Sequence, residues 1–370
     1  MSGSGDDAPF GISRRRFLIS IAVAAILVAG AAGLIGQVTD LGKMTRAASQ
    51  AQLVWLPVCL AGELLAYLGY VLAYRDVARV GGGPRLSLWT ATRVVVLGFG
   101  AFAVGSGAGG LAADFWALHR ASDRPHQSAR RVLGMNTLEW AVLGTFACVA
   151  GALKLAGVGS SAPTGMTIAW IVVVPACIAL AIWFTQPGRA ERFSCLGPSE
   201  DRPRWSQGRR WPRWLWGRLR NGFADAIGGV VVVRAILSRP HRYPAGVLGF
   251  PIYWAGDILT FYAALRAFGV SIGITALVLA YATGYVITSL PLPAGGAGAT
   301  EATLATALRL VGVPFGPAVL AAVLYRVFAF WLPIIPALAF LPLAKGLSDD
   351  LAKTPLQRSD DPLGRLAGEA

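Results

Sequence analysis

Side chains that could bind a polar ligand gather in one stretch near the end of the chain. Three glycines, Gly295, Gly296 and Gly298, stand directly before Glu301. Such glycines let a ligand approach the backbone closely, and a helix that begins after them offers N–H groups and a positive dipole end to phosphate. Arg326 could hold two phosphate oxygens at once, and Glu301 could bind an amine or exchange a proton. These residues predict a site for a polar, phosphate-bearing headgroup.

Other charged residues lie inside apolar segments. An ion at the centre of a bilayer costs about 2.5–3.5 kcal/mol on insertion scales, so each must face inward, find a partner or sit near an interface. We expect Glu63 and Arg309 to sit near helix ends, where their charges reach the interface. Glu139 and Asp257 join the candidate substrate-binding residues, with a purely structural ion pair as the alternative for each.

Patterns typical of enzymes and metal sites are missing from the sequence. The four cysteines and three histidines show no ligand spacing. The glycine run is not a nucleotide-binding P-loop, since no Gly-Lys-Ser/Thr follows it. No Ser/His/Asp or Cys/His set is present. We therefore expect no metal, no cofactor and no enzymatic activity.

The composition predicts an all-α polytopic membrane protein. Hydrophobic residues make up 55% of the chain and charged residues 14%, with a mean hydropathy of +0.57. Soluble domains average about 25% charged residues. Apolar runs reach the roughly 18 residues that mark a membrane helix, and none alternates with the period of two that a β-barrel strand requires.

The net charge of +14 suggests an orientation. Basic chains can bind nucleic acid, but here the arginines group between apolar segments, as in the cytoplasmic flanks of membrane helices. We therefore predict no nucleic-acid partner, a place in the cytoplasmic membrane, and both termini in the cytoplasm. Residues 1–16, the basic loop 186–221 and the polar, disordered tail 346–370 would lie on that side. The Arg14–Arg16 run also resembles a twin-arginine export signal, and we favour the helix flank.

Six apolar segments are long enough for full spans, and two others are interrupted by glycines. The interrupted segments, 86–120 and 271–312, read as re-entrant hairpins, because the first would otherwise place a basic loop outside the membrane. Backbone breaks at membrane depth require a polar cavity or protein contacts. Eight full spans is the alternative. The six predicted spans are about 17–36, 51–73, 130–155, 165–185, 245–267 and 316–343.

The two interrupted segments also look like an internal repeat. Gly109-Gly110 precedes Asp114 much as Gly295-Gly296 precedes Glu301, and Gly109 and Gly295 are 186 positions apart. The loops before the two segments differ in charge, which indicates opposite sidedness. This is the pattern of an inverted-topology repeat, as in many transporters. The transmembrane domain, 17–345, would then consist of halves 17–185 and 222–345.

The stretch 284–336 resembles the transmembrane-domain family of lysylphosphatidylglycerol synthases, also described as flippase-like. The family pattern is a proline and Gly-Gly-x-Gly-x-x-Glu turn followed by an arginine in a proline-bearing final helix. Here Pro293, Glu301, Arg326 and Pro333 match it with the glycines between. Ala294 stands where a proline is usual, and the first-half turn matches poorly. The resemblance implies that Glu139 corresponds to the family's mid-chain glutamate.

The resemblance implies lipid translocation rather than lipid aminoacylation, because the polar tail is too short for a synthase domain. The leading prediction is a translocase for lipid or lipid-linked headgroups, with anionic or lipid-linked membrane lipids as partners. One alternative is a membrane-embedded enzyme acting on a polyprenyl-phosphate or phospholipid. Another is a non-transporting partner of a cell-envelope complex. The oligomeric state is not predicted.

Overall fold

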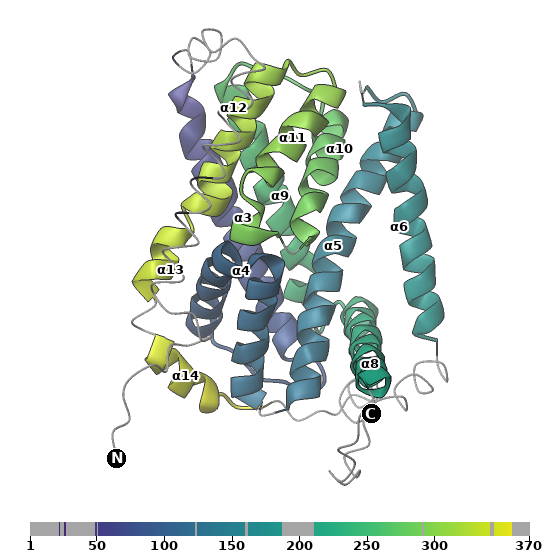
Figure 1. The fold of residues 1–370 in the computed structure, drawn as a ribbon, viewed down its shortest axis with the longest axis vertical. Helices are drawn as coiled ribbons and strands as arrows, with labels where there is room; N and C mark the ends of the chain where they lie inside the picture. The colour runs from purple at the N-terminus through teal and green to yellow at the C-terminus, as the bar shows by residue number, and fades with distance from the viewer. Residues whose placement is uncertain are drawn as a thin grey trace.

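The fold is an upright bundle of helices, described here from a computed structural model (Figure 1). The structure describes residues 51–122, 124–159, 162–186, 211–290, 292–340 and 344–356, together with Ala22, Ile26 and Ser49. These residues form helices and no β-strand. The predicted all-α polytopic membrane fold is therefore confirmed. The predicted first span, 17–36, lies almost entirely outside the described residues.

Five helices of the described part are long and apolar enough to cross a membrane. Each coincides with a predicted span to within a few residues. The last one is continuous through a five-residue π-helix, η5. Their bounds are α3 (Leu56–Ala78, preceded by the short turn η2, Leu53–Trp55), α5 (Pro125–Leu155), α6 (Thr164–Phe184), α9 (Pro244–Ala267), and the series α12 (Phe315–Arg326), η5 (Val327–Trp331) and α13 (Ile334–Phe340).

The first interrupted segment forms α4 (Leu88–Ser122), which folds back on itself. A Cβ added to Gly110 would lie 3.8 Å from the carbonyl oxygen of Gly98, and one on Gly109 would touch Ala101. Twelve residues of straight helix would separate Gly98 from Gly110 by about 18 Å. The chain therefore reverses between Phe102 and Gly109, and Figure 1 shows two short arms side by side in the lower half of the bundle. The segment therefore has the hairpin shape predicted for 86–120, and its re-entrance into the membrane stays a prediction.

The second interrupted segment enters from the other end of the bundle. It consists of α10 (Ile274–Tyr285), the short turns η3 (Val286–Ser289) and η4 (Pro293–Gly296), and α11 (Ala299–Leu310). Its tip meets the tip of α4 at mid-height (Figure 1). A Cβ added to Gly295 of η4 would lie 3.4 Å from the Phe102 ring of α4. Two hairpins from opposite ends thus meet inside the bundle.

The contact between α3 and α9 relates the two halves. A Cβ on Gly62 would lie 2.8 Å from the Gly256 carbonyl oxygen, and one on Gly69 would lie 2.5 Å from that of Gly249. Gly249 and Gly256 follow Gly62 and Gly69 by 187 positions each. Equivalent glycines therefore pack crosswise, as a two-fold axis between the halves requires. The same shift carries α4 onto the α10–α11 hairpin and α5 onto the α12–α13 series.

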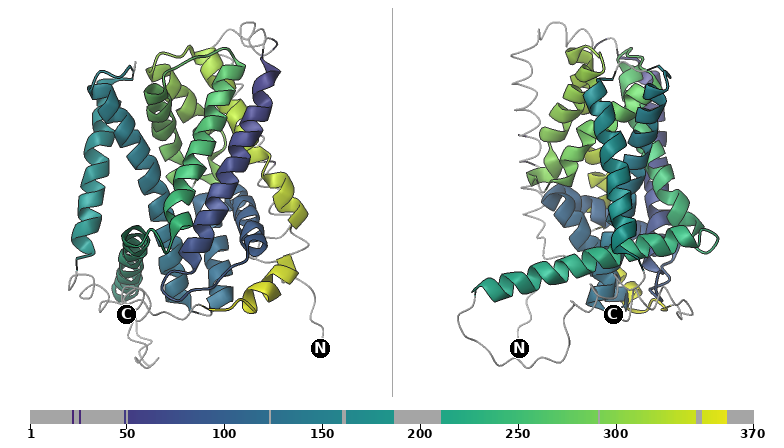
Figure 2. Two further views of the ribbon diagram at one scale, coloured as in Figure 1. Left: turned by 180° about the vertical axis from the view of Figure 1, so that it is seen from behind. Right: turned by 90° about the vertical axis from the view of Figure 1, so that its right-hand side faces the viewer.

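Two helices lie outside the span pattern. The helix α8 (Trp211–Ser238) runs across the lower end of the bundle, nearly at right angles to the spans (Figure 2). It begins inside the predicted basic loop, whose residues 187–210 lie outside the described residues. The helix α14 (Ala344–Ala352) packs beneath α4.

The prediction of a disordered tail from 346 is wrong for its first part. Leu347 and Leu351 are fully buried and stand one helical turn apart. Arg93 of α4 pairs with Asp350 at 2.8 Å, and Arg120 Nε donates to Ser348 Oγ at 3.0 Å. This apolar pair and its polar neighbours hold α14 against both arms of the first hairpin.

Candidate functional site

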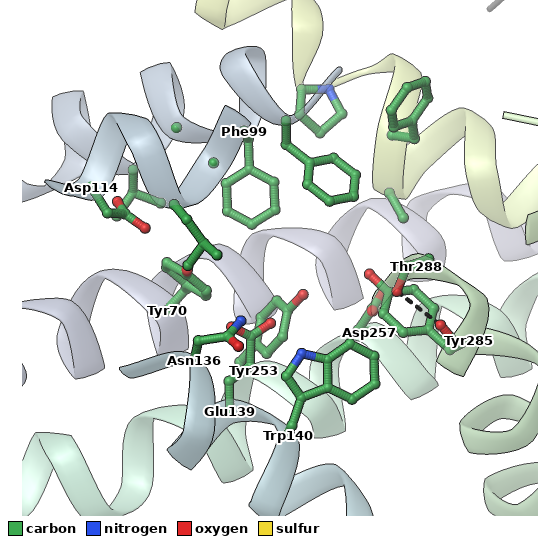
Figure 3. A pocket seen from close by; sticks show the side chains of 18 of the residues that line it. Tyr70, Phe99, Asp114, Asn136, Glu139, Trp140, Tyr253, Asp257, Tyr285 and Thr288 are labelled. Atoms are coloured by element: carbon green, nitrogen blue, oxygen red, sulfur yellow. Dashed lines mark hydrogen bonds between the residues drawn. The ribbon is translucent and has the colours of Figure 1, made fainter. Parts of the chain in front are cut away.

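A cavity of about 350 Å³ lies between the two hairpin tips and the helices α3, α5, α9 and α12 (Figure 3). Aromatic side chains make up much of its wall, and charged and amide groups point into it. Ser289 at its edge is exposed, so the cavity reaches the protein surface. Its charged lining residues are Glu63, Asp114, Glu139, Asp257 and Arg326.

Arg326 joins the second hairpin tip to the last span. Its Nε lies 3.3 Å from Glu301 Oε1, and Nη2 donates to the Gly295 carbonyl at 3.2 Å. Its guanidinium sits 4.1 Å from the centre of the Phe330 ring, a cation–π contact. Arg326 is 2% exposed. Three of the predicted site residues, Gly295, Glu301 and Arg326, are thus in contact.

Glu301 also caps the start of α11. Its Oε2 accepts the N–H of Gly298 at 2.7 Å, which caps the start of α11. Glu301 is 4% exposed and does not line the cavity. It lies behind Arg326, and Gly295, Gly296 and Gly298 likewise do not line the cavity. The expected direct access of a ligand to this turn is therefore limited by the side chains of Arg326 and Phe330.

The hairpin tip has an unusual backbone at Ala294, whose φ is +53°. L-residues other than glycine seldom adopt this left-handed conformation. A proline ring fixes φ near −65°, so proline could not take this shape. Alanine at this position, where the resemblance would place a proline, is compatible with the observed backbone conformation.

Asp257 lies at the centre of the cavity wall and is held by two tyrosines. Its Oδ2 accepts hydrogen bonds from the hydroxyl groups of Tyr281 and Tyr325, the latter at 3.0 Å. Its Oδ1 has no partner among the described residues. Asp257 is 3% exposed, and the free oxygen belongs to a residue of the cavity wall. The sequence prediction that Asp257 and Glu139 face inward agrees with this placement.

Two acidic residues of the cavity were not among the predicted site residues. Glu63 was expected near a helix end, but it lies within α3, is 6% exposed, and has an unpartnered Oε2. Asp114 lies on the returning arm of α4 and is 5% exposed. Its place after the Gly-Gly break, like that of Glu301, was the signal available in the sequence. Arg309 is exposed at the end of α11, where the sequence placed it.

Comparison with protein families shows which family this arrangement belongs to. The family model for the lysylphosphatidylglycerol synthase TM region matches residues 17–337. The chain belongs to that family. This match covers both hairpins and all five described spans, so the resemblance seen over 284–336 extends to the whole membrane region. No soluble synthase domain is evident in the 370 residues. No curated protein matches the chain.

Proposed function

We propose that this family member translocates the headgroups of anionic or lipid-linked lipids across the cytoplasmic membrane. The observation that carries the proposal is the polar cavity between two re-entrant hairpins that enter from opposite ends. A headgroup held there would be within reach of either side after a small movement of one hairpin, as in transporters built from inverted repeats. The volume of about 350 Å³ falls in the usual range for small-ligand sites.

The lining supports a polar ligand with apolar neighbours. Arg326 supplies a guanidinium at the cavity wall, and Glu139 and Asp257 supply carboxyl groups. Charges at this depth are retained only when they have a function or a partner. Gly295, Gly296, Gly298 and Glu301 contribute indirectly, because they form and brace the turn that holds Arg326.

The test is headgroup accessibility in reconstituted vesicles that contain a fluorescent phosphatidylglycerol. We expect Asp257→Asn to slow its translocation by at least about tenfold, which corresponds to about 1.4 kcal/mol. Asparagine keeps the size of the side chain and an oxygen for Tyr281 and Tyr325, so the fold should persist. The control is Asp349→Asn, an exposed residue of α14 outside the cavity.

The transport rates can be compared once both variants melt at the same temperature as the wild type. Loss of transport in Asp257→Asn alone supports the proposal. Equal transport by all three proteins removes Asp257 from the site. A wild type that leaves the lipid distribution unchanged refutes the translocase, and favours the enzyme or the non-transporting partner.

We infer the orientation from the arginine-rich end of the bundle, which carries α8 and α14. Positive flanks stay in the cytoplasm, so we infer that this end of the bundle and both termini lie on the cytoplasmic side of the membrane. In a cysteine-free background, a cysteine at exposed Val158 should react with an impermeant maleimide in intact cells. One at exposed Ser238 should react only after lysis. The reverse pattern would invert the topology.

A further inference from the structure

The two-fold relation between the halves pairs residues with different charges. The 187-position shift that aligns Gly62 with Gly249 also aligns Asp114 with Glu301 and Glu139 with Arg326. The second half therefore holds an acid and a base in contact, whereas the first half holds two acids at the equivalent places. Both halves have an acid at the first position, Asp114 or Glu301. At the second position the first half has the acid Glu139, and the second half has the base Arg326.

Within the described part of the chain, the two first-half acids have no cation of their own. Asp114 and Glu139 both line the cavity and lie within electrostatic range of each other. Among the described residues neither carboxyl group forms an ion pair or a side-chain hydrogen bond. Asp114 is 5% exposed. In Figure 3 it projects from α4 and Glu139 from α5.

Two further carboxyl oxygens at this cavity are buried without a partner in the described part of the chain, which is a second and independent sign that the acids there need a proton or a cation. Glu63 Oε2 and Asp257 Oδ1 are buried without a partner among the described residues, and both residues line this cavity. The cation there, Arg326, already contacts Glu301. Uncompensated carboxylates at membrane depth are neutralised in practice by taking up protons. Four acids around one paired arginine therefore require a proton or another cation.

The titratable groups around the two acids are mostly other acids and tyrosines. Arg93, on the same arm as Gly98, is engaged by Asp350 at 2.8 Å. The other titratable or charged groups that face Asp114 and Glu139 are Glu63, Tyr70 and Tyr74 of α3, Tyr253 and Asp257 of α9, Tyr285 of α10, and Arg326 of α12.

We propose that Asp114 and Glu139 form a proton-binding site that couples proton movement to headgroup translocation. This proposal rests on the proposed function. A headgroup phosphate brought to Arg326 would also approach the carboxylate of Glu139, which repels it, whereas the free Oδ1 of Asp257 can accept a hydroxyl group of the headgroup. Protonation of the acid pair removes part of that repulsion, so proton and anionic headgroup enter the cavity together. The pair takes up one proton per cycle: the carboxylate that gains it becomes a neutral carboxylic acid and returns the proton on the far side.

The first measurement detects the proton without any transport. Infrared difference spectra of the purified protein between acidic and alkaline pH report protonated carboxyl groups. We expect the wild type to show a buried carboxyl band that decreases in Asp114→Asn and in Glu139→Gln, and persists in the control Asp349→Asn. Spectra of both cavity variants identical to the wild type would overturn the proton site, whatever the transport result.

The second measurement uses vesicles with fluorescent phosphatidylglycerol at several pH values. We expect the wild-type rate to fall about tenfold for each pH unit once the acids are mostly ionised, because only the protonated fraction is competent. The double variant Asp114→Asn, Glu139→Gln carries permanently neutral groups and should lose this dependence, while Asp349→Asn keeps it. A pH-dependent double variant, or a wild-type rate that rises with pH, would contradict the coupling. A wild type that transports nothing would refute the proposed function, and the infrared result alone would then decide the proton site.

Discussion

Replacing Gly69 by leucine is expected to prevent the protein from folding. The reason is the contact between α3 and α9, where a Cβ on Gly69 would lie 2.5 Å from both the Gly249 carbonyl oxygen and the Tyr253 backbone nitrogen. All of the nearest atoms belong to the backbone, so no side chain can turn away. Membrane helices associate through such small residues, since no hydrophobic effect drives them together in lipid.

The smaller substitution gives the measurable form of this prediction. Gly69→Ala should lower the stability by about 1–3 kcal/mol, the usual cost of overpacking. Gly256→Ala should lower the stability by about as much. Gly256 is the position equivalent to Gly69 in the second half, and a Cβ there would lie 2.5 Å from the Gly62 carbonyl oxygen. The readouts are the melting temperature in detergent and the yield of monodisperse protein.

Gly165 is the matched control for both variants. It lies in α6, and a Cβ there would meet no atom within 4 Å. Gly165→Ala should be neutral or stabilise the helix by about 0.5–1 kcal/mol. If Gly69→Ala and Gly165→Ala melted alike, the close approach of the two halves would not hold in the protein. If only one of the repeat mates were sensitive, the two-fold relation would be wrong.

The sequence revealed the repeat but not its register. The spacing of Gly109 and Gly295 suggests a shift of 186, whereas the packing of α3 on α9 requires 187. The glycines Gly109 and Gly110 meet Gly295 and Gly296 at a shift of 186, whereas Asp114 meets Glu301 only at 187, so the hairpin sequence alone gives conflicting registers. The crosswise contact of Gly62 with Gly256 removes the ambiguity, and it depends on three-dimensional packing that no local pattern contains.

The membership of the cavity was predictable only in part. Arg326, Asp257 and Glu139 were found because a charge within an apolar run must face inward. Glu63 meets the same criterion, but its depth in the bilayer depends on where α3 begins, and the apolar run does not fix that boundary. Glu301 and the glycines were recognised by their motif, yet the packing of Phe330 and Arg326 places them behind the wall.

A charge swap, Glu301→Arg with Arg326→Glu, is expected to fail to restore the stability that each single variant loses. Each single variant leaves two like charges in a buried site, and disrupting a buried ion pair costs about 3–5 kcal/mol. The double variant would restore opposite charges 25 positions apart in the chain. Simple pair attraction would therefore predict rescue.

The backbone contacts of both residues predict the opposite. Glu301 Oε2 accepts the Gly298 N–H at 2.7 Å, and an arginine at 301 would point donors at that donor. Arg326 Nη2 donates to the Gly295 carbonyl at 3.2 Å, and a glutamate at 326 would point an acceptor at that acceptor. Each unmet buried polar group costs about 1–3 kcal/mol. The hairpin tip thus distinguishes the two ends of the ion pair.

The pair Arg93–Asp350 provides a comparison, because its oxygen and nitrogen lie 2.8 Å apart and the Asp350 side chain is 53% exposed, whereas the Arg93 side chain is 9% exposed. Water reaches one partner of this pair, so its swap should lower the melting temperature less than the swap of the fully buried Glu301–Arg326 pair. Melting curves of the two swaps and their single variants decide the matter. Full recovery in the Glu301–Arg326 swap would show that the contacts to Gly298 and Gly295 contribute nothing. Failure of that swap would show that the Gly298 N–H and the Gly295 carbonyl require an acid at 301 and a base at 326. The swap then tests this structural asymmetry and does not test substrate binding by Arg326.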